Sequence, residues 1–230
     1  MKEWRFRNSK VRGDEVSHKN VNNYAKQAEQ ARELFLKWDQ SKVKLRVGIT
    51  ADDNFLYVDF FNEHFKVNRL DGEVLRCGEI DEKADYNPVM IIYDVLCNSK
   101  SGATLSGEWS QVENLSPHSN FGSKDDSLYS PSGKYFSGKV ELLRKACENL
   151  GGFDTGKSDA GFMFNVFPFL PMIFQFWEGD EEFSPRVVFL FDKKTLEFCC
   201  FESAWFIAAH LVELIRTEMD AEFSMGFYGR

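Results

Sequence analysis

At 230 residues the chain is long enough to bury one sizeable hydrophobic core, and its 43% hydrophobic and 28% charged residues exclude an intrinsically disordered protein. A net charge of −8 with scattered basic residues excludes a protein that tracks the phosphate backbone of nucleic acids, because such affinity comes from clustered Lys and Arg. The 23 phenylalanines predict a core of aromatic rings, with a ring-lined cavity as the alternative. We expect a single domain over residues 1–230, with residues 1–17 as a frayed N-terminal arm.

The sequence contains no sign of secretion or membrane insertion. No apolar stretch follows Met1–Arg5, so we expect no signal peptide and a cytoplasmic protein. The five cysteines lack a disulfide-framework spacing, as expected for reduced thiols in that compartment. Polar residues and prolines interrupt the longest apolar stretch, 161–177, whereas a membrane helix needs about 20 continuous apolar residues. We predict a buried pair of strands there.

The first half of the chain predicts two helices and several strands. Apolar residues at helical spacing indicate an amphipathic helix over 22–38. Branched and aromatic residues indicate strands over 43–49 and 55–61, and Asp71-Gly72 indicates a hairpin turn between 65–70 and 73–75. Pro88 favours a buried helix over 89–97, with a strand as the competing assignment. Residues 99–133 are rich in Ser, Gly, Asn and Asp and indicate a long loop.

The second half predicts two more helices around three strands. A helix over 139–150 should end at Gly151-Gly152, and apolar runs indicate strands over 162–168, 172–178 and 187–191. A final amphipathic helix over 203–223 carries His210 beside its apolar stripe, where we expect a histidine with satisfied hydrogen bonds, with a metal ligand or a general base as the alternative. The predicted fold is α+β, a mostly antiparallel sheet packed by three or four helices around a Phe-rich core.

A phosphate-binding pattern is present but stands in the wrong context. Residues 151–158 match G-x-x-x-x-G-K-S/T, and the apolar strand 187–191 is followed by Asp192, which resembles a magnesium-holding aspartate. Such a loop must follow a strand and begin a helix, so that backbone N–H groups point at the phosphates. Here the predicted helix precedes the loop and a strand follows it. A nucleotide hydrolase is therefore a remote alternative.

Other catalytic chemistry has a single candidate location. No spacing of His and Cys is typical of a zinc or iron–sulfur site, so we predict no such centre and assign no residue as a metal ligand. The acidic turn 178–182 lies between two predicted strands and contains Asp180 and Glu181. With Asp192, these carboxylates are the candidates for acid–base work or for a cation in a carboxylate- or metal-dependent enzyme. A solvated turn is the plainer interpretation.

Several short motifs, in this order and spacing, resemble the uncharacterised family called domain of unknown function 3786. They are Tyr93-Asp-Val-Leu-Cys97, Ser106-Gly-Glu-Trp109, Glu113-Asn-Leu115, Leu150-Gly-Gly152, Phe167-Pro-Phe-Leu-Pro171, Phe176-Trp-Glu-Gly-Asp-Glu-Glu-Phe183 and Leu190-Phe-Asp192. The resemblance spans roughly residues 20–216 and implies a protein of the kind found mainly in anaerobes. Some relatives accompany corrinoid-dependent methyl-transfer systems, which implies a corrinoid-system protein as a partner. The chain has Asn98 where the family often has His.

The favoured hypothesis is a non-catalytic ligand-binding or accessory protein that holds a large planar ligand, such as a corrinoid, in an aromatic cleft. The predicted walls are Trp109, Phe167, Phe169, Trp177 and Phe183, and the predicted polar contacts are Glu108, Asp180 and Glu181. The alternative is that these aromatic rings are ordinary residues of the hydrophobic core and bind no ligand. Exposed aromatic surface leaves a homodimer open, and we expect neither nucleic acid nor membrane as a partner.

Overall fold

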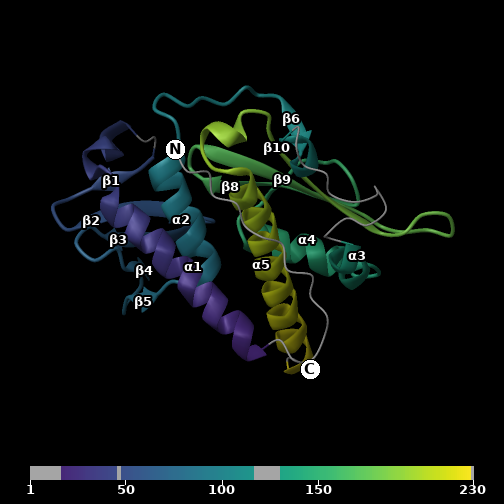
Figure 1. Ribbon diagram of the computed structural model, residues 1–230. Helices are drawn as coiled ribbons and strands as arrows, with labels where there is room; N and C mark the ends of the chain where they lie inside the picture. The colour runs from purple at the N-terminus through teal and green to yellow at the C-terminus, as the bar shows by residue number, and fades with distance from the viewer. Residues whose placement is uncertain (1–16, 46–47, 117–129, 229–230) are drawn as a thin grey trace.

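Two antiparallel sheets and five α-helices make up the part of the chain that the computed structural model describes, residues 17–45, 48–116 and 130–228 (Figure 1). The strand order is β1-β2-β3-β4-β5 in the first sheet and β6-β10-β9-β8-β7 in the second. This confirms the predicted α+β fold, although the strands divide between two sheets. The predicted arm over 1–17 lies outside the described residues, except Ser17, which begins the first helix.

The first sheet is a meander of β1 (Thr50–Ala51), β2 (Phe55–Phe60), β3 (Glu63–Asn68), β4 (Val74–Arg76) and β5 (Glu82–Lys83). Alternate residues of β2 are buried, as expected for a sheet with one covered face. Phe61 and Asn62 join β2 to β3 with φ values of 47° and 60°, the backbone of a tight hairpin turn. The Phe61 N–H donates to the Val166 carbonyl at 2.9 Å, which ties this turn to the second sheet.

The second sheet contains β6 (Trp109–Gln111), β7 (Phe153–Asp154), β8 (Ala160–Phe167), β9 (Leu170–Trp177) and β10 (Arg186–Asp192). The three long strands lie within two residues of the predicted ones. Phe162, Phe174 and Phe189 lie opposite one another in the register and are buried. Side chains directly opposite each other on neighbouring strands share a face of the sheet, so these rings form a row on its inner face.

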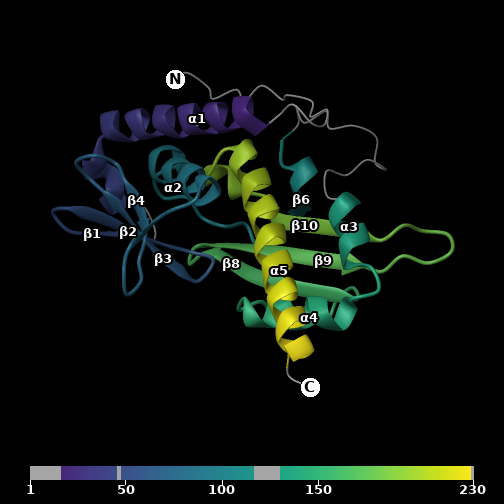
Figure 2. The ribbon, with the colours of Figure 1, turned by 90° about the horizontal axis from the view of Figure 1, so that it is seen from below.

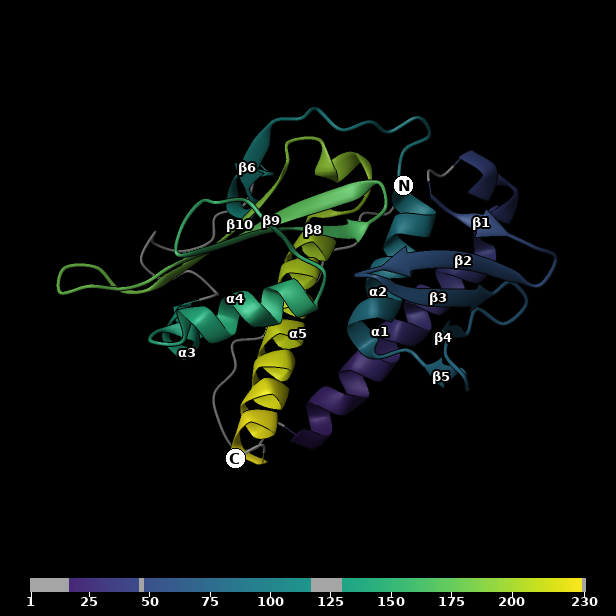
Figure 3. The ribbon, with the colours of Figure 1, turned by 180° about the vertical axis from the view of Figure 1, so that it is seen from behind.

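The helices are α1 (Ser17–Lys37), α2 (Tyr86–Asn98), α3 (Ser130–Phe136), α4 (Val140–Asn149) and α5 (Phe201–Tyr228). Figures 2 and 3 show α3, α4 and α5 on one face of the second sheet and α1 and α2 beside the first. Three short 3-10 helices complete the described part: η1 (Gln40–Leu45), η2 (Val112–Asn114) and η3 (Thr195–Glu197). No helix in the described ranges is long and apolar enough to cross a membrane.

Two predicted segments differ from the structure. The strand expected over 43–49 is wrong, because η1 occupies its first half. The Asp39 carboxylate accepts the Ser41 N–H at 3.2 Å, and the Asp39 carbonyl accepts the Lys42 N–H at 3.1 Å, so local hydrogen bonds start a helical turn. The long loop expected over 99–133 contains β6 and η2 and ends in α3, while residues 117–129 lie outside the described part.

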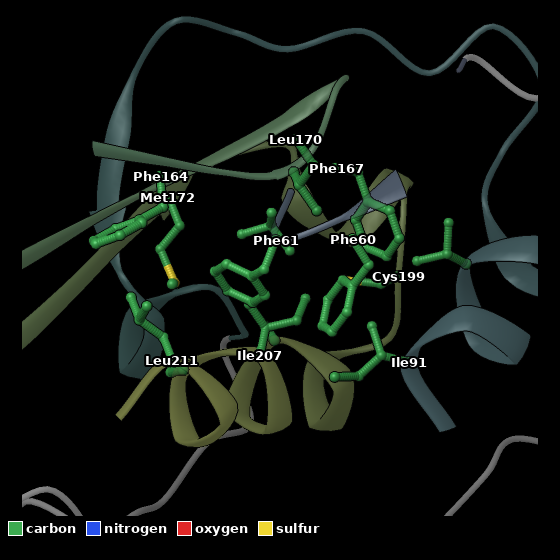
Figure 4. Packing of buried hydrophobic residues seen from close by; sticks show 14 of the residues in the cluster. Phe60, Phe61, Ile91, Phe164, Phe167, Leu170, Met172, Cys199, Ile207 and Leu211 are labelled. Carbon is green, nitrogen blue, oxygen red and sulfur yellow. The ribbon is translucent and has the colours of Figure 1, made fainter. Parts of the chain in front are cut away.

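Both sheets share one hydrophobic core. Figure 4 shows Phe60 and Phe61 of the β2–β3 turn between α5 and the β8–β9 hairpin. The buried hydrophobic residues form one cluster to which both sheets and the helices contribute, and most of its largest fully buried side chains are phenylalanines. The Phe-rich core is confirmed. Because aromatic rings bury large areas, the junction between the sheets holds much of the apolar surface that folding removes from water.

Candidate functional site

A pocket of about 320 Å³ opens between α1, α2 and the start of α5. This volume lies at the lower end of the roughly 300–1,000 Å³ range of small-molecule sites. Its apolar lining comes from all three helices and consists of Ala31, Leu34, Trp38, Met90, Tyr93 and Phe206. Leu34 is a lining residue that is 46% exposed, so it lies where the pocket meets solvent. The pocket therefore offers water-accessible apolar surface to a small ligand.

Polar groups line the part of the pocket where α2 meets α5, and Asp94 organises them. One carboxylate oxygen of Asp94 accepts the Cys200 N–H at 2.7 Å, and the other accepts the Asn98 side-chain amide at 2.6 Å. Cys200 immediately precedes α5, so Asp94 supplies a partner and a negative charge to a helix N-terminus. This contact fixes the position of the start of α5 relative to α2, and thereby the pocket wall.

We expect Asp94→Ala to lower the free energy of unfolding by about 1–2 kcal/mol, the usual cost of removing a helix N-cap partner. Urea denaturation followed by circular dichroism measures this difference. Asp53→Ala is the matched control, because Asp53 is an exposed carboxylate near the β1–β2 turn. Equal unfolding midpoints for the two variants would show that Asp94 does not support α5.

The pocket also contains two thiols, Cys97 and Cys200. Burial raises the pKa of the Cys200 thiol, and the nearby Asp94 carboxylate raises it further. Its Sγ lies 3.4 Å from the Ser203 hydroxyl. Because the thiolate is the reactive form of cysteine, a neutral buried thiol is a weak nucleophile. The arrangement around Cys200 favours recognition of a ligand over covalent chemistry.

The eight residues predicted to form an aromatic cleft do not converge. Phe167 is buried in the shared core, stacked on Phe169 at 5.3 Å between ring centroids, and Phe169 stacks on Phe198 at 5.6 Å. Trp177 lies at the opposite end of β9 from Phe169. Eight residues of strand at about 3.3 Å each separate the two rings by roughly 25 Å. A single ligand of ordinary size does not reach both.

Glu108 and Trp109 lie at the other edge of the second sheet. Trp109 is half-buried in β6 and pairs with Asp192, while Glu108 forms an exposed ion pair with Lys193 at 2.6 Å. Trp109 lies opposite Asp192 and Trp177 lies opposite Arg186, near the two ends of β10. Because side chains alternate along a strand and these two β10 positions are an even number of residues apart, both tryptophans lie on the same outward face of the sheet. The two tryptophans share a face but not a pocket.

The acidic turn is an ordered tip of the β9–β10 hairpin, which projects from the body of the protein in Figure 1. One oxygen of Asp180 accepts the N–H groups of Glu182 and Phe183 at 2.8 and 2.7 Å, and these bonds lower the pKa of Asp180. Glu178 accepts bonds from Ser137 and from the Gly138 N–H. Glu181 and Phe183 are exposed, Phe183 to 70%. Asp180 therefore stabilises the turn itself, whereas Glu178 ties the hairpin to the segment between α3 and α4.

Asp192 is a buried carboxylate that holds a distant loop. It accepts the Ser106 N–H at 3.0 Å, the Ser106 hydroxyl at 2.9 Å, the Gly107 N–H at 2.7 Å and the Lys194 N–H at 2.8 Å. Burial raises the pKa of this carboxyl, but these hydrogen bonds outweigh burial, so its pKa is below the ordinary value. Of the described residues, no group of three or more His, Cys, Asp or Glu is arranged to hold a metal ion.

The phosphate-loop pattern forms a strand, a turn and a strand. α4 precedes it, β7 occupies 153–154, and β8 follows. The Thr155 N–H donates to the Gly161 carbonyl at 2.9 Å, and a Cβ on Gly161 would lie 2.0 Å from the Lys157 carbonyl oxygen. The turn therefore folds onto β8, and no helix N-terminus follows it to receive a phosphate.

Comparison with known proteins assigns a family but no activity. A family described as a domain of unknown function (DUF3786) matches residues 39–214. The chain belongs to the DUF3786 family. No curated protein and no solved structure matches the chain.

The residues that match the DUF3786 family include both long-range contacts described above, that of Asp192 with the Ser106 loop and that of Asp94 with Cys200. Ser106, Gly107 and Asp192 bring two of the motifs together across 86 residues, and Asp94 links the Tyr93–Cys97 motif to α5. Sequence reasoning missed Asp94 and Cys200 as pocket residues. The available signal was Asp94 itself, an acidic residue within a mainly apolar helical motif, because a carboxylate that is partly removed from water needs hydrogen-bond donors.

Proposed function

We propose that this DUF3786 protein is a non-catalytic binding or accessory protein that holds a small, mainly apolar ligand in the pocket between α1, α2 and α5. The observation that carries the proposal is the pocket itself, with aromatic walls at Trp38, Tyr93 and Phe206 and polar groups at one end. Binding sites for small molecules combine these features. The capping role of Asp94 and the raised pKa of Cys200 support binding without catalysis.

The volume and lining indicate the ligand class. A pocket of about 320 Å³ suits a molecule with one or two rings. The Lys37 ammonium, which also pairs with Glu33 at 3.6 Å, is the lining cation that an anionic substituent would meet, while the Asp94 carboxylate is already bonded to Cys200 and Asn98. A tetrapyrrole exceeds this space, so a corrinoid would need surface outside the pocket. Corrinoid binding stays a prediction of the family resemblance, and the carboxylate- or metal-dependent enzyme stays a prediction from the acidic turn 178–182.

We expect 1-anilinonaphthalene-8-sulfonate, a two-ring sulfonate probe, to bind the folded protein saturably. At about 0.3 kcal/mol per heavy atom and about 20 heavy atoms, the dissociation constant should be in the range of tens of micromolar. Leu34→Trp fills the pocket mouth and should weaken binding at least about tenfold. Leu70→Trp places the same ring at a loop residue that is 88% exposed, and this variant should bind the probe as the wild type does. Fluorescence titration measures both.

Equal binding by the two variants would overturn the pocket as the site. A parallel anaerobic titration with cobalamin, followed by absorbance and melting temperature, tests the larger ligand. A saturable spectral change that Leu34→Trp leaves intact would move the binding site elsewhere, whereas an unchanged spectrum and melting temperature would remove the corrinoid from consideration.

A further inference from the structure

We infer that the outward face of the second sheet is an interface between two copies of this chain. Figures 1 and 2 show α3, α4 and α5 together on one face of that sheet. Within the described part of the chain, no helix covers the opposite face. An antiparallel sheet with a solvent-facing side normally presents polar side chains there, so the chemistry of this face indicates whether it remains in water.

The outward positions of this sheet are mainly apolar. Met163, Ile173 and Leu190 form one cross-strand row at its centre and are each half-buried. At the margins, Phe153 pairs with Met163 and is 58% exposed, and Trp177 is 47% exposed. One asparagine of β8 and one glutamine of β9 share this face, so the apolar patch is centred on the cross-strand row that begins at Phe153, and a patch of this kind marks an interaction surface.

The charge distribution favours a second copy as the occupant. The chain has a net charge of −8, so association of two copies through most of its surface is repulsive. On the outward positions of β8, β9 and β10 the charged residues are Arg186, at one end, and Asp192, which Ser106 and Gly107 cover. When two copies bring these faces together, no like charges oppose each other at the centre of the contact.

The geometry and area predict a weak symmetric dimer. Two sheets pack face to face about 10 Å apart, and a twofold axis brings the same rows together. The three long strands, at about 4.8 Å spacing and with about seven residues of about 3.3 Å each, give a footprint of roughly 14 by 23 Å, or about 330 Å² per copy, to which the short strands β6 and β7 add little. This is below the approximately 800 Å² per partner of a standard stable interface, so we expect reversible association at micromolar or higher concentration.

Sedimentation equilibrium of the full chain from about 5 to 500 μM tests this inference. The weight-average mass should rise toward that of a dimer, and Ile173→Lys should raise the dissociation constant at least about tenfold, because it buries an unpaired ammonium. Leu70→Lys adds the same charge on an exposed loop and should dimerise as the wild type does. Raising NaCl from about 0.05 to 0.5 M should strengthen the dimer, because salt screens the repulsion between acidic copies.

Circular dichroism verifies that Ile173→Lys is folded, and Trp177→Lys, at an exposed margin of the same face, serves as the second variant if it is not. A wild-type chain that remains monomeric at every concentration overturns the inference. A dimer that both face variants leave intact, or that salt weakens, places the interface elsewhere and overturns it as well.

Discussion

Replacing Asp192 with Ala is expected to lower the free energy of unfolding by about 3–5 kcal/mol. Asp192 is 1% exposed and accepts hydrogen bonds from three backbone N–H groups and one hydroxyl. Its removal leaves those donors without their carboxylate and detaches the loop at Ser106 from the end of β10. Among the residues that the structure describes, Asp192 is the one buried carboxylate, so its replacement combines the loss of a buried charge with several broken hydrogen bonds.

Equilibrium urea unfolding at pH 7 measures this effect, and Glu108→Ala is the control. Glu108 is exposed, and its side chain pairs only with Lys193 among the interactions described, so removing the side chain should leave the unfolding midpoint nearly unchanged. Because hydrogen bonds hold the pKa of Asp192 below its ordinary value, its contribution is present above the unfolded pKa and lost as pH falls through the folded one. An unfolding midpoint for Asp192→Ala equal to that of Glu108→Ala would contradict this role.

Replacing His210 with Leu is expected to flatten the pH dependence of stability between pH 6.5 and 4. His210 is 7% exposed, its ring stacks on Phe60 at 5.3 Å, and neither ring nitrogen has a hydrogen-bond partner among the described residues. The prediction from the sequence that His210 has satisfied hydrogen bonds is therefore wrong. Burial lowers the pKa of His210 to about 4, with Asp85 opposing this shift and Arg76 adding to it.

The sign follows from proton uptake. Between pH 6.5 and 4 the unfolded chain binds a proton at His210 that the folded chain does not, so the wild type loses stability as pH falls, by about 2 kcal/mol at pH 5. His210→Leu should lack this loss and should equal or exceed wild-type stability at pH 7, since it removes unsatisfied polar atoms. Urea unfolding at pH 7, 6 and 5 measures the difference.

The control is Leu70→Gln, because Leu70 is 88% exposed and the substitution neither removes nor adds a titratable group. This variant should retain the wild-type dependence on pH. Parallel pH profiles for the wild type and His210→Leu would mean that His210 finds a partner or becomes solvated in the folded protein.

The pocket and the open sheet face give separable experiments. The pocket lies between α1, α2 and α5, whereas the proposed dimer face belongs to β8, β9 and β10. Leu34→Trp should therefore leave dimerisation unchanged, and Ile173→Lys should leave probe binding unchanged. Either variant affecting both properties would indicate that the two surfaces are coupled.

Local pattern by itself determined most of the secondary structure. The helices α4 and α5 and the strands β8, β9 and β10 were predicted within a few residues, because their hydrophobic periodicity is strong and their ends carry turn residues such as Gly151-Gly152. The family was also evident from short motifs in order. The strand expected over 43–49 failed where the hydrogen bonds of Asp39 competed with the apolar pattern.

Only the tertiary structure decided which residues form a site. Ser106 and Asp192 meet across 86 residues, and Asp94 and Cys200 meet across 106, distances over which no local pattern operates. Sequence reasoning grouped Phe169 with Trp177 because both are aromatic residues within the family-like motifs, yet a full strand separates them. Periodicity indicates which face of an element is buried, but the register between strands and the packing of helices determine what each side chain meets.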